Sequence, residues 1–214
     1  MCSSPETSRE HAPPLCFFPE VQEIGRDLRK NLVTVPSCDI HNSKKSKDDE
    51  FLRAMVLSSA GAANEVAKHL FMGKMMRAVD RKPHAYSHFF KYEGKLDGGR
   101  AHALKIERKR FDRCIDHLVR AIFYDTYKLK WILPIFIASP NFYSAIDGDR
   151  AVPHSPTYDA IRASSQFLGQ EAVRGENPDV FKYQVRYDEE AKTYAFKGIF
   201  YEFFEVYSLS SPEL

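Results

Sequence analysis

The sequence predicts an α+β fold, because two different hydrophobic periods occupy different parts of the chain. In the middle of the chain, apolar residues recur at the 3.6-residue spacing of a helix with one buried side, at Phe111, Ile115, Leu118 and Ile122. Near the end, apolar and aromatic residues alternate with polar ones, as in a strand with one buried face, at Phe181, Tyr183, Val185 and Tyr187. We therefore expect a helical region followed by a small antiparallel β region in the C-terminal part.

The first 60 residues are predicted to form a unit of their own. Residues 31–36 alternate like a short strand, and the proline and serine at its end close the pattern. A helix is expected to start after Ser46, which together with Asp49 resembles a capping arrangement. The glycine-containing stretch 61–64 is the predicted boundary, so the chain divides into residues 1–60 and 61–214.

The second part is predicted to contain three helices and then strands. The expected helices cover residues 65–79, 101–126 and 156–169, with a largely irregular stretch at 81–100. The expected strands cover residues 180–187, 193–196 and 199–207, with a turn at 188–191 between the first two.

Length and composition favour an ordinary globular protein. The chain has 214 residues, of which 43% are hydrophobic and 28% are charged, which is enough to bury a sizeable core. Residues 1–20 do not have the pattern of a signal peptide. The longest apolar run, 131–138, is interrupted by Pro134 and is too short to span a bilayer. We expect a cytoplasmic protein without a membrane partner, in which the four cysteines bind metal or are simply buried.

Basic residues are concentrated in the middle of the chain. The net charge is only +2, yet residues 68–130 contain 16 Lys or Arg against 7 Asp or Glu. Lys105, Lys109 and Arg113 recur at intervals of four, so they share one face of the predicted helix. Such a face can contact phosphates along a nucleic acid, and a solvated helix surface explains the charge equally well.

Two short stretches carry residues suited to metal-assisted chemistry. The first is REHAPP at residues 9–14, and the second is NLVTVPSCDIHNSKKSKDDEFLR at residues 31–53. In this order and spacing they resemble the HNH, or ββα-metal, endonuclease family, and the resemblance covers roughly residues 1–56. It implies an N-terminal β-hairpin and helix that hydrolyse phosphodiester bonds of nucleic acid, with DNA as the expected substrate. Residues 61–214 would then position the substrate.

The resemblance also implies a role for each matching residue. His11 would be the general base, and Asn31 would orient it or its loop through hydrogen bonds. Glu10 and Asn42 would supply oxygen ligands to a hard divalent cation, Mg²⁺ in most of the family. The sequence departs from the commoner pattern twice, with Glu10 in place of aspartate and Asn42 in place of histidine. Glu10 keeps a carboxylate that is one methylene longer, and Asn42 supplies an amide oxygen suited to a hard ion. Asn42 can equally be a turn or cap residue.

A second, structural metal is a weaker expectation. Many family members brace the hairpin with Zn²⁺ held by two pairs of cysteines, and Cys38 with His41 has the spacing of one such pair. Cys2 is the candidate remnant of the other pair, which is incomplete. Cys38 is otherwise a buried apolar cysteine.

Other histidines are expected to be ordinary. His84 and His88 are four residues apart but lie in a predicted loop, and His117 is expected to be a surface or core residue of its helix. The alternative to a nuclease is a catalytically inactive nucleic-acid-binding or structural module on the same scaffold.

Overall fold

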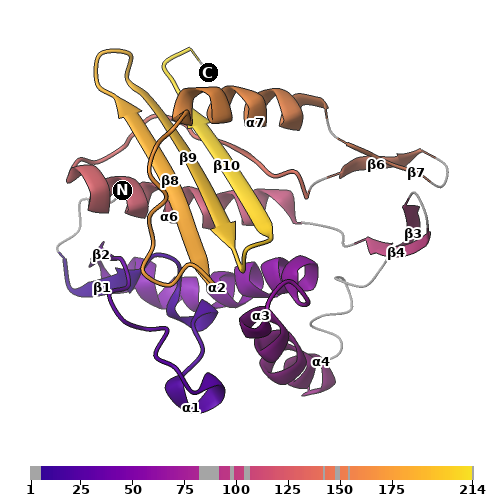
Figure 1. Cartoon of the computed structure of the whole chain (residues 1–214). Coiled ribbons are helices and arrows are strands. Elements are labelled where there is room, and N and C mark those ends of the chain that lie inside the picture. Colours follow the sequence, from indigo (N-terminus) through magenta and orange to yellow (C-terminus); the bar gives the residue numbers. More distant parts are fainter. Residues whose placement is uncertain are drawn as a thin grey trace.

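The structure is a computed structural model that describes residues 6–81, 92–96, 99–103, 107–141, 143–147, 150–153 and 155–213. Within these ranges it describes only the backbone at 39–44, 92–96, 99–103, 143–147, 150–153 and 155–158. The fold is mixed α+β, as the sequence predicts, with helices on both faces of one antiparallel sheet (Figure 1).

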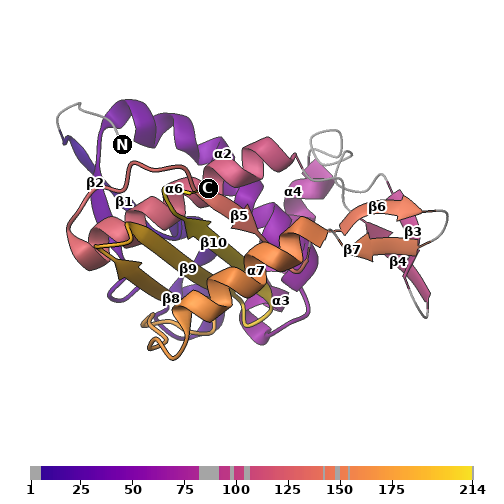
Figure 2. The same cartoon turned by 90° about the horizontal axis from the view of Figure 1, so that it is seen from above.

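The central sheet has four antiparallel strands in the order β5-β10-β9-β8. These strands are β5 (Phe136–Ala138), β8 (Phe181–Asp188), β9 (Thr193–Phe200) and β10 (Phe204–Ser210). Helix α7 (Ser155–Leu168) covers one face, and helix α6 (Arg108–Tyr127) covers the other (Figure 2). The last three strands form a meander because short turns join neighbours that pair along their whole length.

Aromatic side chains fill the space between α6 and the sheet. Phe123 of α6 has its ring centroid 4.8 Å from that of Tyr194 and 5.1 Å from that of Trp131. Tyr194 is completely buried, and its hydroxyl donates to the carbonyl oxygen of Val119 at 3.4 Å. Buried aromatic surface therefore holds α6 against the sheet, and the hydroxyl of Tyr194 has a hydrogen-bond partner there.

The N-terminal segment folds as two strands followed directly by a helix. Strand β1 (Ser8–His11) pairs antiparallel with β2 (Thr34–Ser37), and helix α2 (Asp39–Ala60) begins two residues after β2 ends. Between the strands lie a 3₁₀ turn (Leu15–Phe17) and α1 (Val21–Ile24). The hairpin lies beside α6, and α2 packs along α6 as well (Figures 1 and 2).

One hydrophobic core spans the predicted boundary at residues 61–64. Phe17 stacks against Tyr201 with ring centroids 6.2 Å apart, and the Tyr201 hydroxyl donates to the Phe17 carbonyl oxygen at 2.9 Å. Phe17 also contacts Phe200 of β9, with ring centroids 5.1 Å apart. The N-terminal unit is therefore packed onto the sheet through buried aromatic residues.

The remaining elements follow α2 along the chain or lie beyond the sheet (Figure 1). Helix α3 (Glu65–Leu70), a π-helical turn (Phe71–Met75) and α4 (Met76–Arg81) follow α2. Two further hairpins, β3 (Tyr92–Leu96) with β4 (Gly99–Ala103) and β6 (Tyr143–Asp147) with β7 (Arg150–Pro153), lie next to each other beyond the sheet (Figures 1 and 2). In the described part of the chain, no helix is both long and apolar enough to cross a bilayer.

Several predicted boundaries are wrong, and the start of α2 matters most. The helix begins at Asp39 with Cys38 as its N-cap residue, so Ser46 lies inside the helix instead of capping it. The mostly polar stretch from 39 to 46 hid this start, because Phe51 is the first buried apolar residue among the side chains of α2 that the structure describes. Consequently position 42 belongs to the beginning of a helix and not to a turn before it.

Other differences have equally local causes. Residues 99–103 form strand β4 where the helix was expected to begin, so α6 starts only at Arg108. Tyr201 and Glu202 have positive φ angles and make a turn, which divides the strand predicted over 199–207. Strand β3 lies in the stretch 81–100 that was expected to be largely irregular, and β5, β6 and β7 were not predicted either. By contrast, α7 and β8 lie within one residue of their predicted bounds.

Candidate functional site

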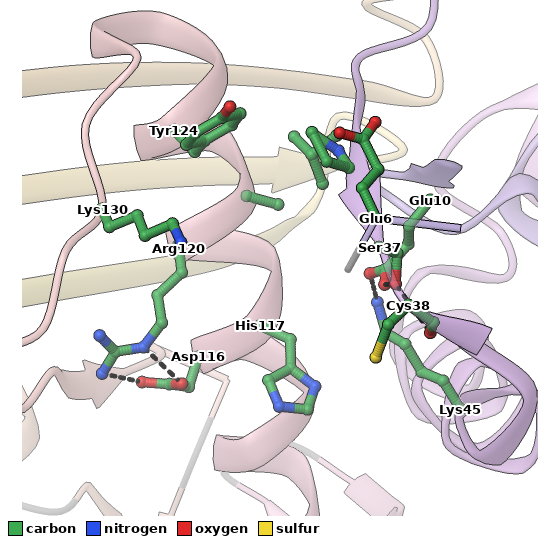
Figure 3. A pocket seen from close by; sticks show the side chains of 13 residues that line it. Glu6, Glu10, Ser37, Cys38, Lys45, Asp116, His117, Arg120, Tyr124 and Lys130 are labelled. Atoms are coloured by element: carbon green, nitrogen blue, oxygen red, sulfur yellow. Dashed lines mark hydrogen bonds and ion pairs between the residues drawn. The ribbon is translucent and has the colours of Figure 1, made fainter. Parts of the chain in front are cut away.

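A cleft separates the N-terminal hairpin and the start of α2 from helix α6 (Figure 3). Its volume is about 560 Å³, within the range of roughly 300–1,000 Å³ typical of ligand pockets. One wall comes from β1, β2 and α2, and the other from α6 and the residues that follow it. The lining residues are mostly polar and include Glu6, Glu10, Ser37, Cys38, Lys45, Asp116, His117, Arg120, Tyr124 and Lys130.

Glu10 brings a largely buried carboxylate to the hairpin wall. It lies on β1 directly opposite Val35 of β2, and its side chain is 17% exposed. Lys45 of α2, whose side chain is 10% exposed, donates from Nζ to Oε1 of Glu10, and the Ser37 hydroxyl donates to Oε2 at 3.5 Å. A charge buried to this extent requires such a partner, so the pair ties the second turn of α2 to β1.

His11 follows Glu10 but faces the other side of the hairpin, because successive residues of a strand point to opposite faces. It is not among the residues that line the cleft. Its imidazole is half-buried, and burial lowers its pKa from the ordinary value of 6.5. The Arg29 guanidinium lowers the pKa further, whereas the Glu10 carboxylate opposes both effects. The imidazole is therefore neutral at neutral pH.

The two asparagines of the motif stand on either side of β2. Asn31 is exposed, with φ of 50°, in the segment that leads into β2. Asn42 lies in α2 three residues before Lys45, so the two positions share one side of the helix. The side chain of Asn42, like that of His41, lies outside the described part. Position 42 therefore lies about one helical turn before the residue that reaches Glu10.

The donor chemistry suits a hard divalent cation. Mg²⁺ keeps several waters and is usually held by one or two carboxylates together with phosphate oxygens. Glu10 offers such a carboxylate at the cleft surface, and an amide oxygen at position 42 is a ligand of the same kind. Among the side chains that the structure describes, no group of three or more His, Cys, Asp or Glu gathers that could hold a metal by itself.

The zinc ligands remain a prediction. Cys38 is buried at the N-cap of α2 and also lines the cleft. Cys2 and the side chain of His41 lie outside the described residues, as do His84 and His88.

A second carboxylate lies next to the Glu10–Lys45 pair. Asp49 Oδ1 is 4.0 Å from Lys45 Nζ, one helical turn further along α2, and its side chain is 25% exposed. Burial raises the pKa of Asp49 from 3.8 to about 6, and the nearby Glu10 carboxylate adds to this shift while Lys45 opposes it. The ionised form of Asp49 at neutral pH therefore lowers the free energy of unfolding.

The α6 wall contains residues that the sequence analysis did not assign to a site. His117 stands at the mouth of the cleft, and both Lys45 and Glu10 of the other wall influence its pKa. Desolvation between the walls lowers that pKa, with a further decrease from Lys45. Arg120 binds Asp116 at 2.8 Å and donates to the Leu133 carbonyl oxygen at 3.0 Å, so it stiffens the wall. Only the packing of α6 against the hairpin reveals this second wall.

The predicted basic face leads toward the same cleft. Lys109 and Arg113 are exposed on α6, and His117 follows at the same interval of four residues. Arg113 is 3.5 Å from Asp48 of α2, which also binds Arg110 at 2.8 Å. Lys105 lies outside the described residues. The described part of this face is therefore a stripe along α6, partly neutralised by α2.

Comparisons with protein-family models, with curated proteins and with solved structures found no match to this chain.

Proposed function

We propose that this protein is a metal-dependent endonuclease of the HNH type, which hydrolyses phosphodiester bonds of nucleic acid, DNA being the expected substrate. The observation that carries the proposal is the contact between Glu10 of β1 and Lys45 of α2. It brings the strand that ends in Glu10 and His11 against the beginning of the helix that contains Asn42. The chain order of strand, strand and helix supports the same assignment.

The proposed chemistry uses the last two residues of β1 together with the beginning of α2. Glu10 and Asn42 would hold a divalent cation, which would offset the negative charge that grows on the phosphate and the leaving oxygen. His11 accepts a proton from the attacking water, a role for which its lowered pKa is suited because the neutral form prevails at neutral pH. Water forms the new P–O bond as the bond to the leaving oxygen breaks. Asn31 keeps the loop before β2 in place.

A cleavage assay tests this function directly. Purified protein is incubated with supercoiled plasmid and Mg²⁺, and nicking is measured with and without chelator. Removing a general base typically costs about 10²–10⁴-fold in rate. We expect such a loss for His11→Ala, a comparable loss for Glu10→Gln, which removes a proposed metal ligand, and none for His69→Ala, a change of an exposed histidine on α3. Circular dichroism and thermal unfolding check that the variants fold. Full activity of His11→Ala would overturn the assignment of the base.

One observation favours the alternative of an inactive nucleic-acid-binding or structural module. The Glu10 carboxylate already has Lys45 and Ser37 as partners, so it can serve the fold without a metal. Under this alternative, wild-type protein binds DNA in a salt-dependent way but does not nick plasmid at any Mg²⁺ concentration.

A further inference from the structure

We propose that the cleft between the hairpin β1–β2 and helix α6 binds a single unpaired nucleotide next to the cleaved bond. Tyr124 would stack on the base, and Lys130 and His117 would contact its phosphates. The proposal rests on the proposed function in one respect, namely that nucleic acid is the ligand. It goes beyond that function by assigning a binding site to the α6 wall, which contributes no residue to the HNH-like motif.

The size of the cleft selects for one nucleotide. A volume of about 560 Å³ accommodates a base, a sugar and a phosphate. A cavity of this volume does not hold the stacked base pairs of a duplex. The strand must therefore enter unpaired, or with one nucleotide turned out of the stack.

The free hydrogen-bond donors of the cleft lie on the α6 side. Among the cationic groups that line the cleft, Lys45 is paired with Glu10, and Arg120 with Asp116. Within the described residues, His117 and Lys130 form no hydrogen bond or ion pair, and both residues are exposed. A phosphate that entered the cleft would thus meet unused donors on the α6 wall, while the carboxylates Glu6 and Glu10 lie on the opposite wall (Figure 3).

Tyr124 supplies the aromatic surface that an unpaired base requires. It follows His117 by seven residues on the same side of α6, so the two residues line one wall two turns apart (Figure 3). Its ring is half-buried, which fixes its orientation while leaving part of it in the cleft. Stacking on a fixed ring is insensitive to sequence, because every base presents a π-face.

The stripe of Lys109, Arg113 and His117 gives the strand a route into the cleft. These residues follow each other at successive turns of α6, with the exposed first two outside the cleft and His117 at its mouth. Phosphates that bind the first two would align the strand along α6, and the next nucleotide would reach Glu10.

Binding is measured by fluorescence anisotropy with a labelled oligodeoxythymidine of about eight nucleotides, a length within the site size of single-strand-binding folds. Chelator is present, so that no cleavage occurs. Tyr124→Leu is expected to weaken binding about tenfold, whereas Tyr124→Phe, which keeps the ring, changes it less than about twofold. Thermal unfolding of both variants checks that the fold is intact.

The charge contact has a matched control two residues away. Lys130→Gln is expected to weaken binding about fivefold and to reduce the dependence of log K on log salt by about one unit. Lys128→Gln removes the same charge from an exposed lysine that pairs with Asp125 and does not line the cleft, and it should change binding less than about twofold. The proposal is overturned if Lys130→Gln weakens oligonucleotide binding no more than Lys128→Gln does. It is also overturned if Tyr124→Leu binds the oligonucleotide as tightly as the wild type. Tighter binding of a blunt duplex of the same length overturns it as well.

The outcome is separable from that of the proposed function. Binding that depends on Tyr124 and Lys130, without any plasmid nicking, supports the cleft and refutes the nuclease. The opposite outcome is also possible to recognise. If nicking needs Glu10 and His11, while Tyr124 and Lys130 affect neither nicking nor oligonucleotide binding, the result supports the nuclease and refutes nucleotide binding in the cleft.

Discussion

Replacing Asp49 by asparagine should stabilise the protein at neutral pH. The pKa of Asp49 in the folded state, about 6, lies above its ordinary value of 3.8, chiefly because the side chain is buried. Folding therefore favours the protonated form, and stability is lost as pH rises from 3.8 to 6. At about 1.36 kcal/mol per pH unit, this interval corresponds to about 3 kcal/mol at pH values above 6. The amide of an asparagine side chain cannot ionise, so the variant avoids that cost.

Urea unfolding followed by circular dichroism measures the effect at two pH values. The gain in free energy of unfolding should be about 3 kcal/mol near pH 8, and roughly half of that near pH 5, where the folded state still retains much of the proton. Glu50→Gln is the matched control, because Glu50 is the exposed neighbour and its change should stay within about 0.5 kcal/mol. A gain for Asp49→Asn that is the same at both pH values would refute the electrostatic reasoning.

Three further predictions concern the base, a helix cap and a close approach of helices. If His11 is the base, the rate of plasmid cleavage should fall as pH drops through a value below 6.5. Arg29→Gln should move this fall to higher pH, because the Arg29 guanidinium lowers the pKa of His11. An unchanged pH–rate profile would show that Arg29 does not influence the base. Asn64→Ala should lower the free energy of unfolding by about 1–2 kcal/mol in urea titrations, because Asn64 Oδ1 accepts from the Ala67 amide at 2.9 Å; an unchanged midpoint and slope would contradict this capping role. Gly61→Ala should cost about 1–3 kcal/mol, because its Cβ would come within 2.7 Å of the Phe71 ring; an unaltered melting temperature would show that the ring moves aside freely.

The residues of the candidate site could be predicted unevenly from the sequence. Glu10 and Asn42 could be singled out because each lies in one of the two short stretches that make up the motif. His117 and Tyr124 could not, because they belong to a helix whose pattern identifies only its buried side. Nothing in the sequence indicates that the exposed side of that helix faces Glu10. That proximity follows from packing of α6 beside α2 and β2.

The fold shows the same division. The period of α6 and the alternation of β8 are local properties, so their existence and type could be predicted. Strand β5 has three residues and pairs with β10 about seventy positions later, a contact that local pattern cannot indicate. The start of α2 was missed for a related reason, since its first turns carry polar residues whose partners, such as Glu10, lie in another element.

By itself the sequence determined the α+β class, the helical and strand character of the strongly periodic segments, and the short list of residues able to bind a cation or accept a proton. These depend on neighbours in the chain, whose spacing sets which side chains share a face. Only the tertiary structure decided that Lys45 of α2 pairs with Glu10, and that a second wall from α6 closes a cleft in front of Glu10. Burial and distance between remote segments arise when apolar surfaces pack together, and no local pattern contains that information.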